Sequence, residues 1–426
     1  MKSIPTAKMN RRDFLRTTAT AIAFPAIVRG GDASSKVSIA VVGVNGRGSE
    51  LAVAFAGLPN VAVAALCDVD ERPLAKAIDV VTRKAGDAPR GERDFRRLLE
   101  DKSIDAVVIA TPDHWHAPAA ILACAAGKHV YVEKPCSHNP QEGEWLVAAA
   151  RRHQRVVQHG TQRRSWPAVQ EAIAKLHAGA IGRVLSAQAF YFNNRPAIGH
   201  GKAAPVPAGL DWALWQGPAP ERAFHDNFVP YHWHWFWDWG TGELGNNGVH
   251  MIDLCRWGLG ANHAQRTTSA GRKSRDDDDQ ETPDTNIVSF DTGAAAITWE
   301  CRSWAARVPH DPAHDVAFFG ENGSLLISGS GYTIHDPAGK ETTRGAGPGG
   351  NDSHLQNFID AIRDGKKLNA EIEEGHKSTL LCHFGNIAWR TGQTIDFTPQ
   401  SGIAGDGRAK KLWRREYRPG WEPQPA

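Results

Sequence analysis

The chain has 426 residues, with 49 Lys and Arg against 47 Asp and Glu, a formal charge of +2, and 41% hydrophobic residues. This length suggests two or three domains that each bury a core, and the composition excludes disorder as the main state. The near-neutral charge lacks the basic excess of a nucleic-acid binder, so we expect no nucleic-acid partner. The six cysteines are widely spaced, which favours isolated apolar cysteines over a disulfide scaffold.

Residues 1–33 are predicted to be an export signal. Arg11 and Arg12 precede a mildly apolar run at 17–28, which is too short to span a bilayer. This pattern is typical of a twin-arginine signal, whose pathway moves folded proteins, although an ordinary basic N-terminus is the alternative. We therefore expect export by the twin-arginine route to the periplasm or cell exterior, and no stable membrane span.

Residues 36–159 alternate between short apolar segments and helix-length amphipathic segments. The patterns predict strands at 37–42, 61–67, 104–110, 129–132 and 156–158, with helices at 49–58 and 116–126. Because β-α-β alternation covers a parallel sheet on both faces, this region predicts a Rossmann dinucleotide-binding domain of the α/β class.

Residues 160–400 predict a second, α+β domain with a large mixed, mostly antiparallel sheet. Its alternating strands are expected at 184–191, 285–290, 294–299, 315–319 and 324–328. Helices at 355–363 and 377–390 are expected to pack back against the first domain, and 401–426 form a C-terminal tail. The four aspartates at 276–279 indicate a solvated loop, with a calcium site as the weaker alternative.

A glycine-rich turn follows the first predicted strand and precedes a helix. In a dinucleotide site, such a turn lets the main chain approach the pyrophosphate, which lies on the amides of the helix N-terminus. Asn45 stands where the usual motif has its second glycine, and Asn tolerates a left-handed backbone. The candidate cofactor contacts in this turn are Gly43, Asn45, Gly46, Arg47 and Gly48.

Asp68 ends the second predicted strand. An acid at this place binds the adenosine ribose hydroxyls and repels a 2'-phosphate, which favours NAD over NADP. The alternative is that Asp68 is a turn or cap residue.

Two further motifs follow buried strands of the first domain, T-P-x-x-x-H at 111–116 and A-G-K-H-V-x-x-E-K-P at 126–135. With the glycine turn, they closely resemble the glucose-fructose oxidoreductase and inositol dehydrogenase family, Gfo/Idh/MocA, over about residues 37–399. The resemblance implies an NAD(P)-dependent oxidoreductase acting on CH-OH groups of carbohydrate-like substrates. It also implies a homo-oligomer, a dimer or tetramer, formed through the open sheet of the second domain.

The resemblance further implies roles for individual residues. Lys134 would lie between nicotinamide and substrate and contact the reacting hydroxyl, where a desolvated ammonium stabilises a developing alkoxide. His116 would line the nicotinamide side, although packing at its helix start is the alternative. The expected cofactor contacts in these motifs are Thr111, Pro112, Asp113, His116, Glu133 and Lys134.

A second motif of the family corresponds to residues 242–253. By resemblance His250 would be the general base, a role that suits the near-neutral pKa of histidine. Asp253 lies one helical turn further on and is expected to orient His250. Asn246 replaces an aspartate of many relatives, and because Asn does not exchange a proton, His250 would work with Lys134 alone.

Seven of the 15 tryptophans fall between residues 212 and 257. Indole faces cover sugar C–H surfaces, so a carbohydrate or cyclitol pocket is predicted, although we expect more than half of these rings to form core or an interface. His232 and His234 resemble a metal pair, but without a third ligand we predict aromatic-pocket histidines and no metal. The candidate substrate contacts are Arg163, Trp235, Asp238, Asn246 and Asp253.

The leading hypothesis is hydride transfer between a nicotinamide and a sugar, glycoside or cyclitol hydroxyl carbon. Because free NAD is not expected outside the cell, a tightly bound cofactor that shuttles hydride between two sugars is one form of this hypothesis. A redox-neutral glycosidase acting through a transient ketosugar is an alternative. A non-catalytic sugar or NAD sensor is the alternative of another class, against which Lys134 and His250 argue.

Overall fold

Two sheets with their covering helices make up the described part of the chain in this computed structural model. The described residues are 36–275, 277–400, 402–404 and 407–423. The predicted export signal at 1–33 lies outside the described residues. No helix within these residues has the length and apolar character needed to cross a membrane.

The first sheet has six parallel strands in the order β3-β2-β1-β4-β5-β6. The chain leaves the central β1 for β2 on one side and later returns to β4 on the other. Ligands bind outside the carboxyl ends of the strands at such a switch point. The strands are β1 Val37–Val42, β2 Val61–Cys67, β3 Arg90–Glu92, β4 Ala106–Ile109, β5 His129–Val132 and β6 Val157–His159.

Five helices of the first domain connect these strands: α2 Arg47–Ala56, α3 Glu71–Ala85, α4 Phe95–Glu100, α5 Asp113–Ala125 and α6 Pro140–Arg152. The predicted Rossmann fold is confirmed. Two of the helices begin earlier than predicted, α2 by two residues and α5 by three (47 against 49, and 113 against 116). The sequence patterns gave no prediction for α3, β3, α4 and α6, although Asn139 caps α6 by accepting a hydrogen bond from the Glu142 amide.

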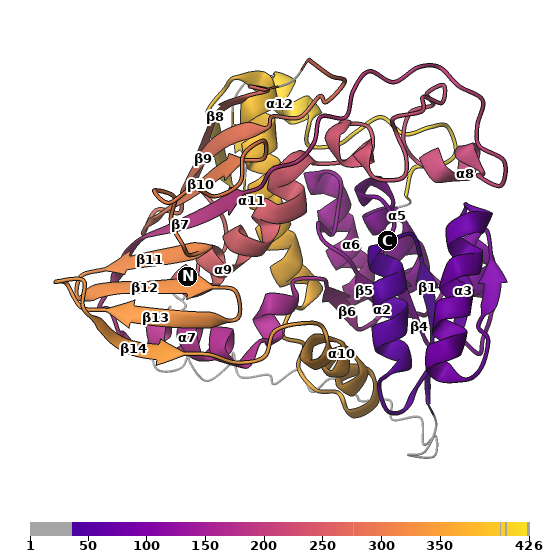
Figure 1. The fold of residues 1–426 in the computed structure, drawn as a ribbon, viewed down its shortest axis with the longest axis horizontal. Helices are drawn as coiled ribbons and strands as arrows, with labels where there is room; N and C mark the ends of the chain where they lie inside the picture. Colours follow the sequence, from indigo (N-terminus) through magenta and orange to yellow (C-terminus); the bar gives the residue numbers. More distant parts are fainter. Residues whose placement is uncertain (1–35, 276, 401, 405–406, 424–426) are drawn as a thin grey trace, which may run out of the picture. The chain divides into compact units, whose positions relative to one another are not determined.

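The second sheet has ten strands in the order β14-β13-β12-β11-β7-β10-β9-β8-β15-β16 (Figure 1). Only β7 and β10 pair in parallel among these strands, so the predicted mixed, mostly antiparallel sheet is confirmed. The strands are β7 Val184–Phe192, β8 Arg266–Arg272, β9 Thr285–Asp291, β10 Ala296–Arg302, β11 Val316–Gly320, β12 Gly323–Ser328, β13 Gly331–His335, β14 Glu341–Gly345, β15 Ile395–Thr398 and β16 Gly402–Ala404.

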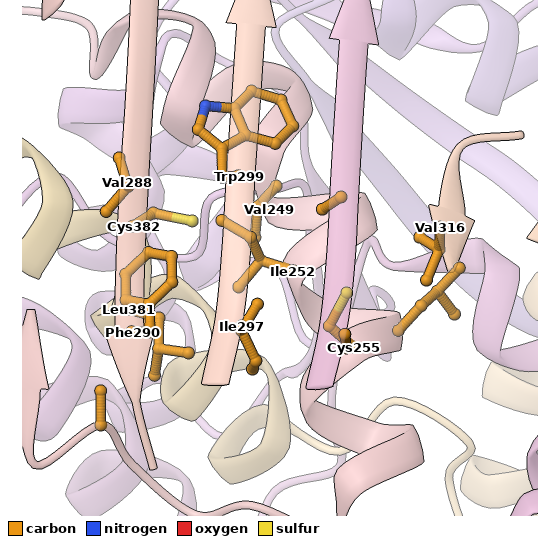
Figure 2. Packing of buried hydrophobic residues seen from close by; sticks show 14 of the residues in the cluster. Val249, Ile252, Cys255, Val288, Phe290, Ile297, Trp299, Val316, Leu381 and Cys382 are labelled. Atoms are coloured by element: carbon orange, nitrogen blue, oxygen red, sulfur yellow. The ribbon is translucent and has the colours of Figure 1, made fainter. Parts of the chain in front are cut away.

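One face of this sheet is covered by α7 Pro167–His177, α9 Val249–Leu259 and α11 Ile372–Thr391. Alternate residues of β9 and β10 point at these helices and form the largest apolar core of the described residues (Figure 2). Each fully buried aliphatic or aromatic side chain there contributes about 1.5–3 kcal/mol. This core fixes α9, which carries His250.

Helix α10, Asp352–Asp364, packs against the first sheet rather than the second. Phe358 makes edge-to-face contacts with Phe55 of α2 and Tyr131 of β5, at ring-centroid distances of 6.3 and 6.0 Å. Helix α11 contacts α6 as well as α9 and β8. The two sheets are therefore joined by shared packing.

The tryptophan-rich stretch between β7 and α9 has little regular structure. It contains α8 Trp212–Gln216, a 3-10 turn at His232–Trp235 and a π-helical turn at Leu244–Gly248. Its own apolar cluster buries four of the seven tryptophans noted in the sequence: Trp212, Trp215, Trp235 and Trp239. Most of these rings therefore form core, as predicted.

Candidate active site

The turn after β1 is built from glycines for steric reasons. Gly43 has φ of 80°, and a Cβ on it would lie 2.7 Å from the Thr111 amide nitrogen. A Cβ on Gly48 would lie 1.8 Å from the Gly43 carbonyl oxygen. Gly46 has φ of 94°, precedes α2, and faces space with no atom within 4 Å of a Cβ position. The turn therefore presents bare main chain at the N-terminus of α2, as anion binding requires.

Asn45 does not have the left-handed backbone for which the sequence allowed. Among the described non-glycine residues only Asn60 and Gln154 have positive φ. The positive φ values of this turn belong to Gly43 and Gly46, at 80° and 94°. The turn therefore tolerates Asn45 because the two glycines take the conformations that a side chain disfavours.

Asp68 lies at the end of β2 beside this turn. Its carboxylate accepts hydrogen bonds from the amides of Val44, at 2.8 Å, and Asp70, at 3.0 Å. Burial raises the pKa of Asp68 to about 6 despite these amide donors. Asp68 therefore ties the glycine turn to β2, at the place where a ribose acceptor was predicted.

A cavity of about 860 Å³ lies at this edge of the first sheet. Six of the predicted cofactor residues line it: Gly43, Asn45, Gly46, Asp68, Thr111 and Pro112. The other six do not line it and are considered separately below: Arg47, Gly48, Asp113, His116, Glu133 and Lys134. The volume falls within the range of sites for small molecules and cofactors.

The outer wall of the cavity comes from the tryptophan-rich stretch, which sequence reasoning did not connect to the cofactor. No local motif marks these residues, because they reach the cavity only through folding. The wall residues are Ala204, Pro205, Pro207, Leu210, Leu214, Trp215, Phe224, Asp226, Val229, Pro230 and Trp233.

The C-terminal tail braces this outer wall. Arg415 donates to the His114 carbonyl oxygen at 2.7 Å and pairs with Glu142 at 2.7 Å. Arg418 donates through its side chain to the Ala213 carbonyl oxygen at 3.0 Å. Trp421 packs edge-on against Trp115, with ring centroids 5.6 Å apart. Residues 415–421 therefore connect the wall to α5 and α6 of the first domain, and we call this segment the C-terminal brace.

His116 connects the cavity to the turn that carries Lys134. Its Nδ1 lies 2.6 Å from the Pro135 carbonyl oxygen and its Nε2 lies 2.8 Å from the Thr111 carbonyl oxygen. His116 thus positions the turn before α5 against the turn that carries Lys134.

Lys134 is partly buried, and its ammonium group binds Asn246. Its Nζ donates to the Asn246 main-chain oxygen at 2.7 Å and to the side-chain Oδ1 at 2.9 Å. Burial lowers the pKa of Lys134, while the nearby carboxylates of Glu133 and Asp113 act in the opposite direction. Asn246 therefore orients Lys134, and the two residues come from different domains.

Two predicted cofactor contacts are instead internal ion-pair partners. Arg47 donates from Nε to Glu133 at 2.8 Å and from Nη2 to the Asn351 side chain at 2.9 Å. Glu133 is buried, and the neighbouring charges of Arg47 and Lys134 outweigh that burial and lower its pKa to about 2. The pair fixes the start of α2 to the strand end before Lys134.

Asp113 makes a contact that sequence reasoning missed. It is buried at the start of α5 and accepts a hydrogen bond from the Thr241 hydroxyl at 2.6 Å. Burial raises its pKa. Asp113 therefore joins the first domain to the segment that leads to Asn246 and His250.

His250 stands in the first turn of α9, partly exposed. Burial and the charge of Lys134 lower its pKa to about 3, so the expectation of a near-neutral pKa is wrong. Its Nδ1 is buried with no hydrogen-bond partner among the described residues. The ring is thus a neutral imidazole at physiological pH and keeps a free lone pair.

The prediction that Asp253 orients His250 is also wrong. Asp253 is buried, receives Nε and Nη2 of Arg164 at 2.8 and 2.9 Å, and accepts from the Ser378 hydroxyl at 2.6 Å. Its carboxylate therefore fixes α9 to α11 and the segment after β6. His250 and Asp253 lie three residues apart on α9, but the carboxylate of Asp253 binds the buried Arg164 and not the His250 ring.

Three predicted substrate contacts lie in other surroundings. Arg163 is buried and donates to Asp315 at 3.2 Å and to the Gly329 carbonyl oxygen at 2.7 Å. Trp235 is buried in the aromatic cluster, and Asp238 accepts from Arg222 at 3.2 Å. The contacts of these three side chains are internal, and their substrate roles stay predictions. Within the predicted substrate set, Asn246 hydrogen-bonds Lys134.

A polar cluster beside Lys134 was not predicted. Glu243 is buried, forms an ion pair with Arg195, and accepts from the Asn247 side chain at 2.6 Å. Arg195 also donates to the hydroxyls of Tyr231, at 3.0 Å, and Tyr191, at 3.1 Å. The charge of Glu243 acts on Lys134, so this Arg195 cluster adjoins the reactive lysine.

The two histidines of the tryptophan-rich stretch each bind a main-chain carbonyl. Nδ1 of His232 lies 3.0 Å from the Asn227 oxygen, and Nδ1 of His234 lies 2.6 Å from the Tyr231 oxygen. They lie in a 3-10 turn rather than a strand. In the described part of the chain no group of three or more His, Cys, Asp or Glu side chains is placed to hold a metal ion.

The six-stranded parallel sheet and the cavity at its edge define a Rossmann domain of the kind that binds a dinucleotide. Residues 37–161 match the family described as "Oxidoreductase family, NAD-binding Rossmann fold", and residues 189–298 match its "C-terminal alpha/beta domain". The chain belongs to the Gfo/Idh/MocA family.

Curated relatives resemble part of this chain. A "Glycosyl hydrolase family 109 protein" of Saccharopolyspora erythraea is 32% identical over 170 residues, 38% of this chain and 36% of the relative. "Levoglucosan dehydrogenase" of Pseudarthrobacter phenanthrenivorans is 31% identical over 168 residues, 39% of this chain and 36% of the relative. The chain thus spans about a third of the length of these relatives.

A solved structure extends the likeness in fold. The aldose-aldose oxidoreductase from Caulobacter crescentus, complexed with glycerol, has a TM-score of 0.65 and 18% identity. The match covers 85% of this chain and 100% of that one. Both domains therefore share one architecture with that protein.

Proposed function

We propose that this protein is an NAD-dependent oxidoreductase acting on a hydroxyl carbon of a sugar, glycoside or cyclitol. The observation that carries the proposal is the junction at His116, which binds Thr111 of the cavity and Pro135 beside Lys134. Through it, a dinucleotide-sized cavity and a desolvated ammonium group belong to one site. Family membership supports the same reaction class.

The residues of the cavity fit NAD. The bare main chain at Gly46 and the N-terminus of α2 suit a pyrophosphate, and Asp68 suits ribose hydroxyls. Arg72, Arg93 and Arg96 also line this end, but each is paired with a carboxylate, of Asp70, Glu71 and Asp94 respectively. We therefore propose NAD rather than NADP.

Bound NAD would supply the acceptor and donor of hydride. Lys134 would donate a hydrogen bond to the substrate oxygen and stabilise its developing negative charge. The neutral ring of His250 would accept the hydroxyl proton, with Asn246 keeping Lys134 in place. The hydrogen bonds of Lys134 to Asn246 leave its third N–H for the substrate.

The test is the nicotinamide content of the purified protein. The full chain is produced with its export segment, purified after export, denatured, and the released nucleotide is measured by mass spectrometry. Near-stoichiometric NAD(H), and tighter rebinding of NAD than NADP, would support the proposal. A protein that carries no nicotinamide and does not bind added NAD would contradict it and favour the sensor hypothesis.

A redox-neutral glycosidase is the second candidate, and the resemblance to glycosyl hydrolase family 109 proteins favours it. In this reaction a sugar hydroxyl is oxidised to a ketone, the acidified neighbouring C–H bond loses its proton, and elimination breaks the glycosidic bond. Water then adds to the resulting double bond, and the hydride returns to the ketone. Lys134 and His250 would serve the oxidation step in either case. Release of 4-nitrophenol from 4-nitrophenyl glycosides without net NADH formation would distinguish it from a dehydrogenase.

We further propose that the protein is exported by the twin-arginine route with its cofactor already bound, and works in the periplasm or cell exterior. The sequence at 11–28 supports this proposal, as does a cavity with an outer wall braced by the C-terminal segment. A homo-oligomer formed through the second sheet is proposed on family resemblance alone.

A further inference from the structure

We infer that His234 is a further residue of the reaction site, whose Nε2 accepts a hydrogen bond from a hydroxyl of an uncharged carbohydrate substrate beside Lys134. The inference rests on the proposed oxidoreductase function and adds a residue and a substrate class to it. It is carried by the tautomer of His234, its neighbours, and the charge balance of the Arg195 cluster.

The hydrogen bond of Nδ1 defines the tautomer of His234. Nδ1 lies 2.6 Å from the main-chain oxygen of Tyr231, and because a carbonyl oxygen only accepts, Nδ1 carries the hydrogen. In the neutral ring Nε2 therefore has a lone pair. Nε2 has no hydrogen-bond partner within the described residues.

The neighbours of His234 place it between the cofactor cavity and the Arg195 cluster. Its ring stacks on Trp233, which lines the cavity, with centroids 3.5 Å apart and planes at 20°. The Tyr231 ring also lies near, with its centroid 4.4 Å from that of His234, and the Tyr231 hydroxyl accepts a hydrogen bond from Arg195. His234 is partly exposed, so this position is open to a ligand.

The main chain also fixes this position. A Cβ on Gly240 would lie 2.4 Å from the His234 carbonyl oxygen, so only glycine permits this approach. Thr241, the next residue, binds Asp113 of the first domain. His234 is thus held against the same domain junction that positions Lys134.

Electrostatics agree with this placement. Burial lowers the pKa of His234 to about 3, and the charges of Lys134 and Arg195 act in the same direction. Glu243, the ion-pair partner of Arg195, acts on Lys134 in turn. At physiological pH the ring is therefore neutral and is an acceptor at Nε2.

The substrate class follows from the charge balance. Arg195 would attract a carboxylate or phosphate if its charge were free, but buried Glu243 neutralises it. The hydroxyls of Tyr191 and Tyr231 and the aromatic faces of Tyr231 and Trp233 remain as polar and apolar contacts. Hydroxyl partners with aromatic faces suit a neutral sugar rather than a uronate or sugar phosphate.

The experiment compares His234 with His232, its neighbour in the same 3-10 turn, which also binds a main-chain carbonyl through Nδ1. The variants are His234→Phe, which keeps an aromatic ring without an acceptor, His234→Gln, which keeps an acceptor, and the matched His232→Phe and His232→Gln. NAD content and thermal unfolding are measured first for every protein. The probes are levoglucosan, D-glucose and 4-nitrophenyl β-D-glucoside, with D-glucuronate as the charged counterpart.

Turnover is followed at 340 nm and by nitrophenol release, and sugar binding by saturation-transfer NMR on NAD-loaded protein. We expect H234F to lower kcat/KM and binding of the best neutral sugar at least tenfold with NAD content unchanged, H234Q to lose less, and both His232 variants to match the wild type. Equal effects of H234F and H232F would overturn the role of His234. The substrate class would be overturned if the NAD-loaded wild type preferred D-glucuronate or bound no neutral sugar. A wild type that cannot bind NAD would instead contradict the proposed function itself.

Discussion

The cofactor side and the substrate side of the candidate site are built in different ways. The cofactor side uses main chain at the ends of β1, β2 and β4, with glycines where a side chain would collide. The substrate side uses buried ion pairs and hydrogen bonds between side chains, such as Arg195 with Glu243 and Lys134 with Asn246. A main-chain site is marked by one continuous motif. On the substrate side a motif marks single residues such as Lys134, but not their partners, because the partners come from distant segments.

The largest expected effect concerns the substrate side. Lys134→Ala removes the ammonium that we propose to stabilise the substrate oxygen, and loss of such a charge-stabilising donor costs on the order of a hundred- to a thousandfold in kcat. NAD content should stay unchanged, because Lys134 does not line the cavity. Steady-state kinetics with the best neutral sugar provide the measurement, and exposed Lys102→Ala is the matched control. Turnover within tenfold of wild type in Lys134→Ala would remove this lysine from the proposed chemistry.

Acid should unfold the protein through its buried neutral histidines. Burial lowers the pKa of His114, His159 and His383 to about 3 and that of His354 to about 4. In the unfolded chain these groups take up protons below about pH 6.5, so each subtracts about 1.4 kcal/mol of stability per pH unit between about 6.5 and its folded pKa.

Thermal unfolding followed by circular dichroism should therefore show a Tm that is similar at pH 7 and 8 and falls steeply from pH 6.5 to 4.5. The main-chain turn of the cofactor side contains no titrating histidine, so bound NAD should raise Tm without removing this acid dependence. A Tm that is constant from pH 7 to 4.5 would show that these rings are not kept neutral.

A smaller effect is expected from the C-terminal brace, which supports the outer wall of the cofactor side. The double variant Arg418→Ala and Trp421→Ala removes a hydrogen bond to Ala213 and the contact with Trp115. We expect NAD to dissociate about tenfold faster, a loss of about 1.4 kcal/mol, with turnover at saturating NAD near wild type. Dissociation is measured by dilution into a nucleotide trap.

The control for the brace is Arg344→Ala, which removes an exposed arginine that pairs with Glu341 in the second sheet. It should leave NAD dissociation unchanged. If the double variant and this control release NAD at the same rate, the cofactor side is closed by the tryptophan-rich stretch without help from the tail.

The errors of the sequence predictions have a common cause. His250 was expected to have a near-neutral pKa, but burial and the charge of Lys134 lower that pKa to about 3. Asp253 was expected to orient His250, but its carboxylate binds Arg164 instead. In each case a partner far away in the sequence decides what the side chain does.

The sequence by itself determined the Rossmann domain, the mixed sheet, the glycine turn with Asp68, and the motifs that carry Lys134 and His250. These follow from local periodicity, from steric demands on glycine, and from short motifs. Only the tertiary structure decided that Asn246 binds Lys134, and that Gly43 and Gly46 rather than Asn45 have positive φ. It also decided that residues of the 204–233 stretch line the cavity and that the tail braces this wall. Pairing between distant side chains depends on burial and charge, which arise only when the chain has folded.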